Sequence, residues 1–220
     1  MKLLAISTSD QIASVALLCD GILTDDRECD RTKNHSETLL PAVDELLAAH
    51  RLTLNKIDAF AADIGPGSFT GIRIGISTMN AISLALKKPL YGIDSLTALA
   101  ARTNADGSIC PILDARNGNG YASLFYGKTL KRGPEAIVID EFLKEIPADT
   151  LFIGSGALLH RESILRLTHT SSFLEEGNTV SASGVALAAW DLIEAGEKGM
   201  SVLTPLYIRP SQVERLNLRQ

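Results

Sequence analysis

The stretch DIGPGSFTGIRIG, residues 63–75, decides how this chain is organised. It joins an apolar run at 57–64, which predicts a buried strand, to an apolar segment at 69–86. That segment is too long for a strand and lacks alternation, so it predicts a helix that follows a Gly-Pro-Gly turn. Three glycines fall four residues apart on one helical face, at Gly67, Gly71 and Gly75. Because an interior glycine costs about 1 kcal/mol relative to alanine, such a face indicates close packing against another backbone.

Length and composition set the first limits on function. The chain has 220 residues, a hydrophobic content of 45% and a formal net charge of −5, which fit one large domain or two small lobes. A protein that binds nucleic acid by itself usually carries a basic surface, so we expect contacts with RNA to run through a partner. No signal-peptide pattern opens the chain, and no uncharged apolar run reaches transmembrane length. The sequence therefore predicts a cytoplasmic protein that makes no membrane contact.

A pattern of strands recurs in the two halves of the chain. Strands are predicted at 3–7, 13–19 and 22–29, with the hairpin signal Asp20-Gly21 between the last two. Strands at 109–114, 121–126 and 128–131 repeat this unit, and Gly127 follows Gly21 at an offset of 106 residues (127 − 21). The repeat favours two related lobes over a chance recurrence of hairpins.

The boundaries and remaining helices follow from turn and cap signals. The polar segment 103–108 separates the halves, so we predict a first lobe at 1–102 and a second lobe at 103–220, whose last segment can return to the first. Helices are predicted at 34–50, 96–102 and 185–195. Asn34 with Glu37 suggests a capping box for the first of these, and Ser95 a cap for the second.

Several motifs together resemble one known family. They are the three-strand hairpin unit, the segments His35–Pro41 and Gly65–Gly75, the tripeptide Asp114–Arg116 and the terminal Pro205–Arg209. Over nearly the whole chain the sequence resembles the bacterial TsaB type, the non-catalytic partner in the complex that makes N6-threonylcarbamoyladenosine beside the tRNA anticodon. The glycine-rich segment is the most specific of these motifs.

The resemblance implies a fold and a set of partners. The implied fold is α/β, with two duplicated actin-like, sugar-kinase-like lobes that each hold a mixed sheet with helices. The implied partners are a catalytic TsaD-type paralogue in a heterodimer, a small TsaE-type ATPase, and a second copy of the chain in a homodimer when the paralogue is absent. Contact with tRNA would run only through the complex, and no cofactor is expected.

Phosphate binding is the first alternative that the residues raise. The segment 65–75 has no lysine, so it does not fit a P-loop. In the actin-like fold, hairpin turns and an acidic residue hold phosphate and metal, and the resemblance implies aspartate where this chain has Ser7. A serine lacks the anionic oxygen that a hard cation prefers. Candidates for residual nucleotide binding in the second lobe are Asp114, Gly154 and Gly156.

The sequence has neither the residue spacing of a metal site nor the motif of a catalytic nucleophile. Catalytic paralogues carry two histidines four residues apart, whereas Leu39 follows His35 at that spacing. The other histidines are widely separated, at His50, His160 and His169. Three scattered cysteines fit neither a disulfide framework nor a zinc site. Ser68 lacks the glycine of a nucleophile elbow, because Pro66 occupies that position, and it fits a helix cap better.

An interface is the function that remains. Small residues allow helices to approach closely, and the glycine face could meet either the chain's own lobe or a second subunit. The family resemblance favours the second subunit, so we expect a scaffold subunit that supports a catalytic paralogue. A stand-alone actin-like ATPase or kinase is the alternative, and a peptidase is the third possibility. The expected interface residues are His35, Leu39, Leu40, Gly67, Phe69, Thr70, Gly71, Ile74 and Gly75.

Overall fold

Two five-stranded mixed sheets form the framework of the chain. The structure is a computed structural model that describes residues 1–103, 105–168 and 170–209. The first sheet has the order β3-β2-β1-β4-β5. Its strands are β1 (Lys2–Ser7), β2 (Ser14–Cys19), β3 (Ile22–Glu28), β4 (Ala59–Asp63) and β5 (Leu90–Ile93). β1 pairs antiparallel with β2 and parallel with β4.

The second sheet repeats this arrangement in the order β10-β9-β6-β7-β8. Its strands are β6 (Ser108–Asp114), β7 (Asn119–Tyr126), β8 (Thr129–Val138), β9 (Leu151–Ile153) and β10 (Ser172–Phe173). β6 likewise pairs antiparallel with β7 and parallel with β9. Ile6 and Ile112, which an offset of 106 residues aligns, both lie in the cluster that packs on the outer side of their sheet. The predicted duplication is therefore confirmed.

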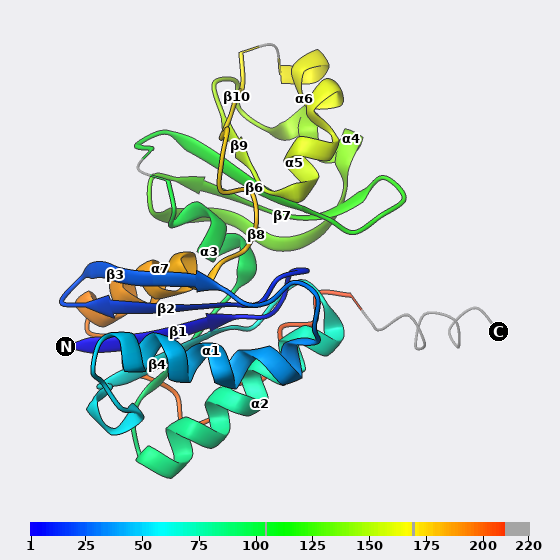
Figure 1. Ribbon diagram of the computed structural model, residues 1–220. Coiled ribbons are helices and arrows are strands. Elements are labelled where there is room, and N and C mark those ends of the chain that lie inside the picture. The colour runs from blue at the N-terminus through cyan, green and yellow to red at the C-terminus, as the bar shows by residue number, and fades with distance from the viewer. Residues whose placement is uncertain (104, 169, 210–220) are drawn as a thin grey trace.

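Helices cover both faces of the sheets (Figure 1). They are α1 (His35–Ala49), α2 (Phe69–Leu86), α3 (Ser95–Ala100), α4 (Ile139–Phe142), α5 (Ser155–Leu159), α6 (Arg161–Thr168) and α7 (Ala182–Glu194), with short 3-10 turns η1 (Leu54–Lys56) and η2 (Leu143–Glu145). α1 and α2 lie on the outer face of the first sheet, and α4, α5 and α6 lie on the outer face of the second. α3 and α7 lie between the sheets, where one core cluster joins residues of both.

α7 comes late in the chain but packs against β1 and β2 of the first sheet. The segment after it also returns there, because Met200 bridges to Leu90, the first residue of β5. The domain boundary between residues 102 and 103 stays a prediction from the sequence.

Three local predictions are wrong. Asn34 does not cap α1 with its side chain; its Nδ2 donates to Glu37 Oε1 at 2.8 Å instead. Asp94, not Ser95, caps α3 by accepting from the Leu96 and Thr97 amides at 3.1 and 3.0 Å. β8 runs to Val138 rather than to 131, because β7 continues to pair with it past an irregular register. The predicted hairpin at Asp20-Gly21 is confirmed by the antiparallel pairing of β2 with β3, and the positive φ angles of the two residues, 48° and 81°, are typical of a type I′ turn.

Candidate functional site

The first turn of α2 is built as the sequence predicts. β4 ends at Asp63, a Gly-Pro-Gly turn follows, and Ser68 Oγ accepts a hydrogen bond from the Gly71 amide at 3.2 Å. Ser68 therefore satisfies a free amide at the helix start, as expected for a cap. The Ser68 amide itself donates to the Ser9 carbonyl at 2.7 Å, which ties the helix start to the loop after β1.

The glycine face of α2 packs inside the lobe, and the expectation that it meets a second subunit is wrong for Gly71 and Gly75. A Cβ on Gly71 would overlap the Thr8 carbonyl oxygen, and one on Gly75 would overlap Thr8 Oγ1. Gly67 is exposed at its surface, yet a Cβ there would lie 2.5 Å from the Ser9 carbonyl oxygen. The close backbone partner is therefore the chain's own β1–β2 loop.

Asp63 holds the β1–β2 loop in place through hydrogen bonds. It is 1% exposed, and its Oδ1 accepts from the Gly65 amide at 2.9 Å and from Ser95 Oγ at 2.7 Å. Its Oδ2 accepts from Ser7 Oγ at 3.0 Å and from Ser9 Oγ. Burial raises the pKa of this carboxyl above its usual range, and the four donors oppose that shift. Ser7, where the resemblance implies an aspartate, thus faces a carboxylate supplied by the neighbouring strand.

Sequence reasoning missed Asp63 as the acidic centre of this turn. The residue is visible at the end of the predicted strand, but its serine partners come from two other segments, Ser7 and Ser9 at the end of β1 and just after it, and Ser95 at the start of α3. The parallel pairing of β1 and β4, which brings the ends of both strands together, would have been the signal.

A cleft of about 440 Å³ opens between the lobes beside this loop. Both lobes line it, with polar side chains that include Asp10, His35, Asp114, Arg116 and Arg209. His35 Nε2 donates to the Asp10 carbonyl at 3.0 Å, so the His35 ring is held by a hydrogen bond within the first lobe.

The three nucleotide candidates of the second lobe do not gather around that cleft. Asp114 lines it, and Ser155 lines it in place of the neighbouring glycines. A Cβ on Gly156 would meet the Asp114 amide at 3.0 Å, and one on Gly154 would overlap the Ile112 carbonyl. Both glycines therefore serve close packing of α5 on β6, which is the second lobe's counterpart of the α2 glycines.

A larger cavity of about 550 Å³ lies elsewhere between the lobes, among α3, α7 and the β7–β8 turn. None of the residues that the sequence marks as candidates lines it. Within the described ranges, no three histidine, cysteine, aspartate or glutamate side chains gather as a metal site. His169, one of the histidines considered above, lies outside those ranges.

The expected interface residues divide between the core and the surface. Leu39 is 1% exposed and packs in the core of the first lobe, so its assignment to an interface is wrong. Leu40 and Phe69 are 49% and 38% exposed, Thr70 is exposed, and Ile74 is half-buried. Leu40, Phe69 and Thr70 therefore remain available on the outer side of α1 and α2, whereas Ile74 packs partly against the core.

α2 exposes both apolar and polar side chains on its outer side, including Phe69, Arg73 and Leu84. Its 18 residues have a mean hydropathy of 1.2, but only 33% of them are buried. By length and composition alone, α2 could cross a membrane, but core helices of soluble proteins meet the same two criteria. Here the inner side packs against β4 and β1 of the chain's own sheet.

Comparison with solved structures defines the class of this fold. A Pseudomonas aeruginosa protein described as uncharacterized with similarity to the peptidase YEAZ superposes with a TM-score of 0.80 and 26% identity, over 94% of this chain and 99% of that one. A ROK family protein from Streptococcus pneumoniae, at 10% identity, shares the fold with a TM-score of 0.54, over 89% of this chain and 99% of that one. The chain is thus a two-lobed α/β protein of the actin-like, sugar-kinase-like class.

Sequence comparison narrows that class to one family. Residues 30–209 match the family model described as TsaD, tRNA N6-adenosine threonylcarbamoyltransferase. The tRNA threonylcarbamoyladenosine biosynthesis protein TsaB of Bacillus subtilis is 32% identical over 182 residues, which cover 79% of this chain and 80% of that protein. TsaB of Escherichia coli is 30% identical over 168 residues, 71% of this chain and 72% of that protein. The chain belongs to the TsaB family.

Proposed function

We propose that this chain is a non-catalytic subunit that docks on a catalytic TsaD-type paralogue in the cytoplasm and supports its modification of tRNA. The observation that carries the proposal is the outer side of α2, where Phe69, Ala81 and Leu84 are exposed although the inner side of the helix packs in the core. Leu84 near its end is 71% exposed. Large apolar side chains exposed on a helix whose other side packs in a core are typical of an interaction site.

The docking face is defined by exposed residues of two neighbouring helices. Figure 1 shows α1 and α2 side by side on the outer face of the first sheet. Along α2 the exposed residues recur at helical spacing, so they form one stripe. The docking face consists of Leu40 and Pro41 from α1 and of Phe69, Thr70, Arg73, Ser77, Ala81 and Leu84 from α2.

The match to the TsaD family supports the choice of partner. The transferases of that family resemble this chain over a stretch that contains both α1 and α2. A paralogue with the same pair of helices offers a similar surface, so the two pairs can pack as a four-helix bundle around a pseudo-two-fold axis. The small residues in the middle of the stripe, Ser77 and Ala81, allow the helices to approach closely. A second copy of this chain offers the same pair of helices, so we also expect weaker self-dimerisation when the paralogue is absent.

The hydrogen bonds made by Asp63 fit a supporting rather than a catalytic role. Both oxygens of Asp63 already accept two hydrogen bonds each, from Ser7, Ser9, Ser95 and the Gly65 amide. A carboxylate held in this way stabilises the loop beneath α2. The chemistry therefore belongs to the paralogue, with a small TsaE-type ATPase as a further member of the complex.

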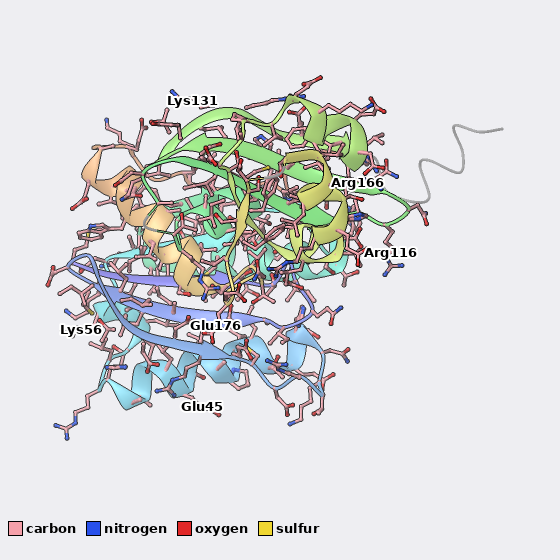
Figure 2. All side chains as sticks on the ribbon, turned by 90° about the horizontal axis from the view of Figure 1, so that it is seen from above. Glu45, Lys56, Arg116, Lys131, Arg166 and Glu176 are labelled. Carbon is pink, nitrogen blue, oxygen red and sulfur yellow. The ribbon has the colours of Figure 1, made fainter. Side chains whose placement is uncertain are left out.

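Contact with tRNA runs through the complex in this proposal. The formal charge of −5 opposes binding to phosphates. Basic side chains such as Lys56, Lys131 and Arg166 point outward at separate places on the surface (Figure 2).

Reconstitution with omission of single components tests the proposed function. The purified chain, its TsaD-type paralogue, the TsaE-type ATPase and tRNA are incubated with ATP and an enzymatic source of threonylcarbamoyl-adenylate, and modified adenosine is counted by mass spectrometry. We expect no product from the chain without the paralogue, and strongly reduced product from the paralogue without the chain. Product formed by the chain alone, or ATP hydrolysis by it at a rate typical of kinases, would contradict the proposal.

A further inference from the structure

Arg73 is held in one position by two aromatic rings from distant parts of the sequence. Its guanidinium carbon lies 3.9 Å from the centroid of the Phe69 ring, one helical turn earlier in α2. Its Nε donates to Tyr207 Oη at 2.8 Å. The Tyr207 ring stacks on Phe69 with centroids 4.8 Å apart and an interplanar angle of 20°. The three side chains therefore fix the direction of the guanidinium before any partner arrives.

Tyr207 is held in turn by the backbone of the C-terminal segment. The Leu206 amide donates to the Ile64 carbonyl at 2.8 Å. Further back, Asn80 holds Leu203 through two hydrogen bonds, of 3.0 Å to its carbonyl and 2.8 Å from its amide. The terminal Pro205–Arg209 motif thus positions an aromatic ring against the start of α2, a role that the sequence did not reveal.

The charge of Arg73 has no counter-ion within the part of the chain that the structure describes. It is the single charged residue of α2, and none of the ion pairs found among the described residues includes it. Because Nε is used by Tyr207, the two terminal nitrogens remain for an outside acceptor. A guanidinium fixed in this way is suited to bidentate pairing with a carboxylate.

We propose that Arg73 is the specificity anchor of the docking face and pairs with a carboxylate of the catalytic paralogue. The inference rests on the proposed function and names one chemical feature of the partner. Arg73 lies on the exposed stripe with Thr70 and Ser77, so docking removes it from water. A charge buried in an interface without an opposite charge opposes association, and the partner must therefore bring an acid to this point. A partner surface without that acid binds more weakly, so the face prefers the paralogue to a second copy of this chain, whose own docking face contains no acid.

Binding to the purified paralogue, followed by isothermal titration calorimetry at two salt concentrations, tests the anchor. We expect Arg73→Gln to weaken association at least about tenfold and to reduce its dependence on salt. Arg73→Lys should recover only part of the loss, because an ammonium cannot stack on an aromatic ring in this way or form two parallel hydrogen bonds to a carboxylate. Tyr207→Phe, which keeps the ring stack and removes the acceptor of Nε, should fall between wild type and Arg73→Gln. Lys131→Gln removes an exposed charge from β8 and should bind like wild type.

Three outcomes would overturn the anchor, and they separate it from the proposed function. If Leu84→Asp abolishes binding while Arg73→Gln binds like wild type, the docking face stands and the anchor is wrong. If neither variant alters binding, the docking face itself is wrong. If Arg73→Gln leaves protein association intact but weakens binding of tRNA to the assembled complex, the anion is a phosphate instead. Equal melting temperatures of wild type and Arg73→Gln establish that the fold is not the cause.

Discussion

Thr8 and Gly71 join the loop after β1 to α2 by two contacts, one from the Thr8 side chain and one from its backbone. Thr8 Oγ1 donates to the Gly71 carbonyl at 2.8 Å, and the Thr8 carbonyl oxygen lies where a Cβ on Gly71 would be. No side chain fits between these two residues. The contact explains why the helix has a glycine at this position although glycine weakens helices.

Gly71→Ala should therefore destabilise the fold itself. Overpacking against a backbone carbonyl costs about 1–3 kcal/mol, which exceeds the gain of up to about 1 kcal/mol in helix propensity. We expect the melting temperature to fall by several degrees in differential scanning calorimetry, at about 2–4 °C per kcal/mol for a chain of this size. Gly107→Ala is the matched control, because no atom lies within 4 Å of its added Cβ. Equal melting temperatures of wild type and Gly71→Ala would show that the two backbones are not in contact.

Aspartate at position 7, where the family resemblance implies one, should be harmful in this chain. Ser7 Oγ lies 3.0 Å from Asp63 Oδ2, so Ser7→Asp would place two carboxyl groups side by side in a buried site. Like charges at this distance cannot both ionise, and we expect a loss of about 3–5 kcal/mol at neutral pH in urea denaturation.

The exchange variant Ser7→Asp/Asp63→Ser provides the control for that prediction. It keeps one acid and one hydroxyl, so it should recover most of the stability that the single variant loses. A single variant as stable as wild type, or an exchange variant no better than the single one, would mean that the two positions do not interact.

The buried Asp63 also predicts a pH dependence. Its native pKa is raised above the ordinary value of 3.8, so the native state binds more protons than the unfolded state as the pH rises from that value to the native pKa. The free energy of unfolding of wild type should fall over that window relative to Asp63→Asn, and the difference should then level off. Urea denaturation of both proteins at a series of pH values measures it. A difference that grows in favour of wild type as the pH rises would contradict the raised pKa.

The sequence predicts local structure and the duplication well because both follow from short-range patterns. The hairpin at Asp20-Gly21, the extent of α2 and its Ser68 cap are all present as expected. These features depend on turn chemistry and periodicity within a few residues.

The direction in which the glycine face points could not be predicted, because it depends on long-range packing. Periodicity places Gly71 and Gly75 on one side of the helix, but it does not say whether that side faces the chain's own sheet or a second subunit. The loop at Thr8, which lies 63 residues earlier in the sequence, decides the matter. Once the glycines face inward, the exposed stripe that ends at Leu84 must lie on the opposite side.

The position of the docking face is tested most directly by two leucine substitutions of equal chemistry. Leu84 on α2 and Leu159 on α5 are 71% and 65% exposed, so aspartate at either position should leave the melting temperature nearly unchanged. We measure the dissociation constant of each variant with the TsaD-type paralogue by analytical ultracentrifugation. The account predicts that Leu84→Asp weakens association at least about tenfold, since it buries an unpaired charge, and that Leu159→Asp binds like wild type. Wild-type affinity for Leu84→Asp, or a loss confined to Leu159→Asp, would contradict it.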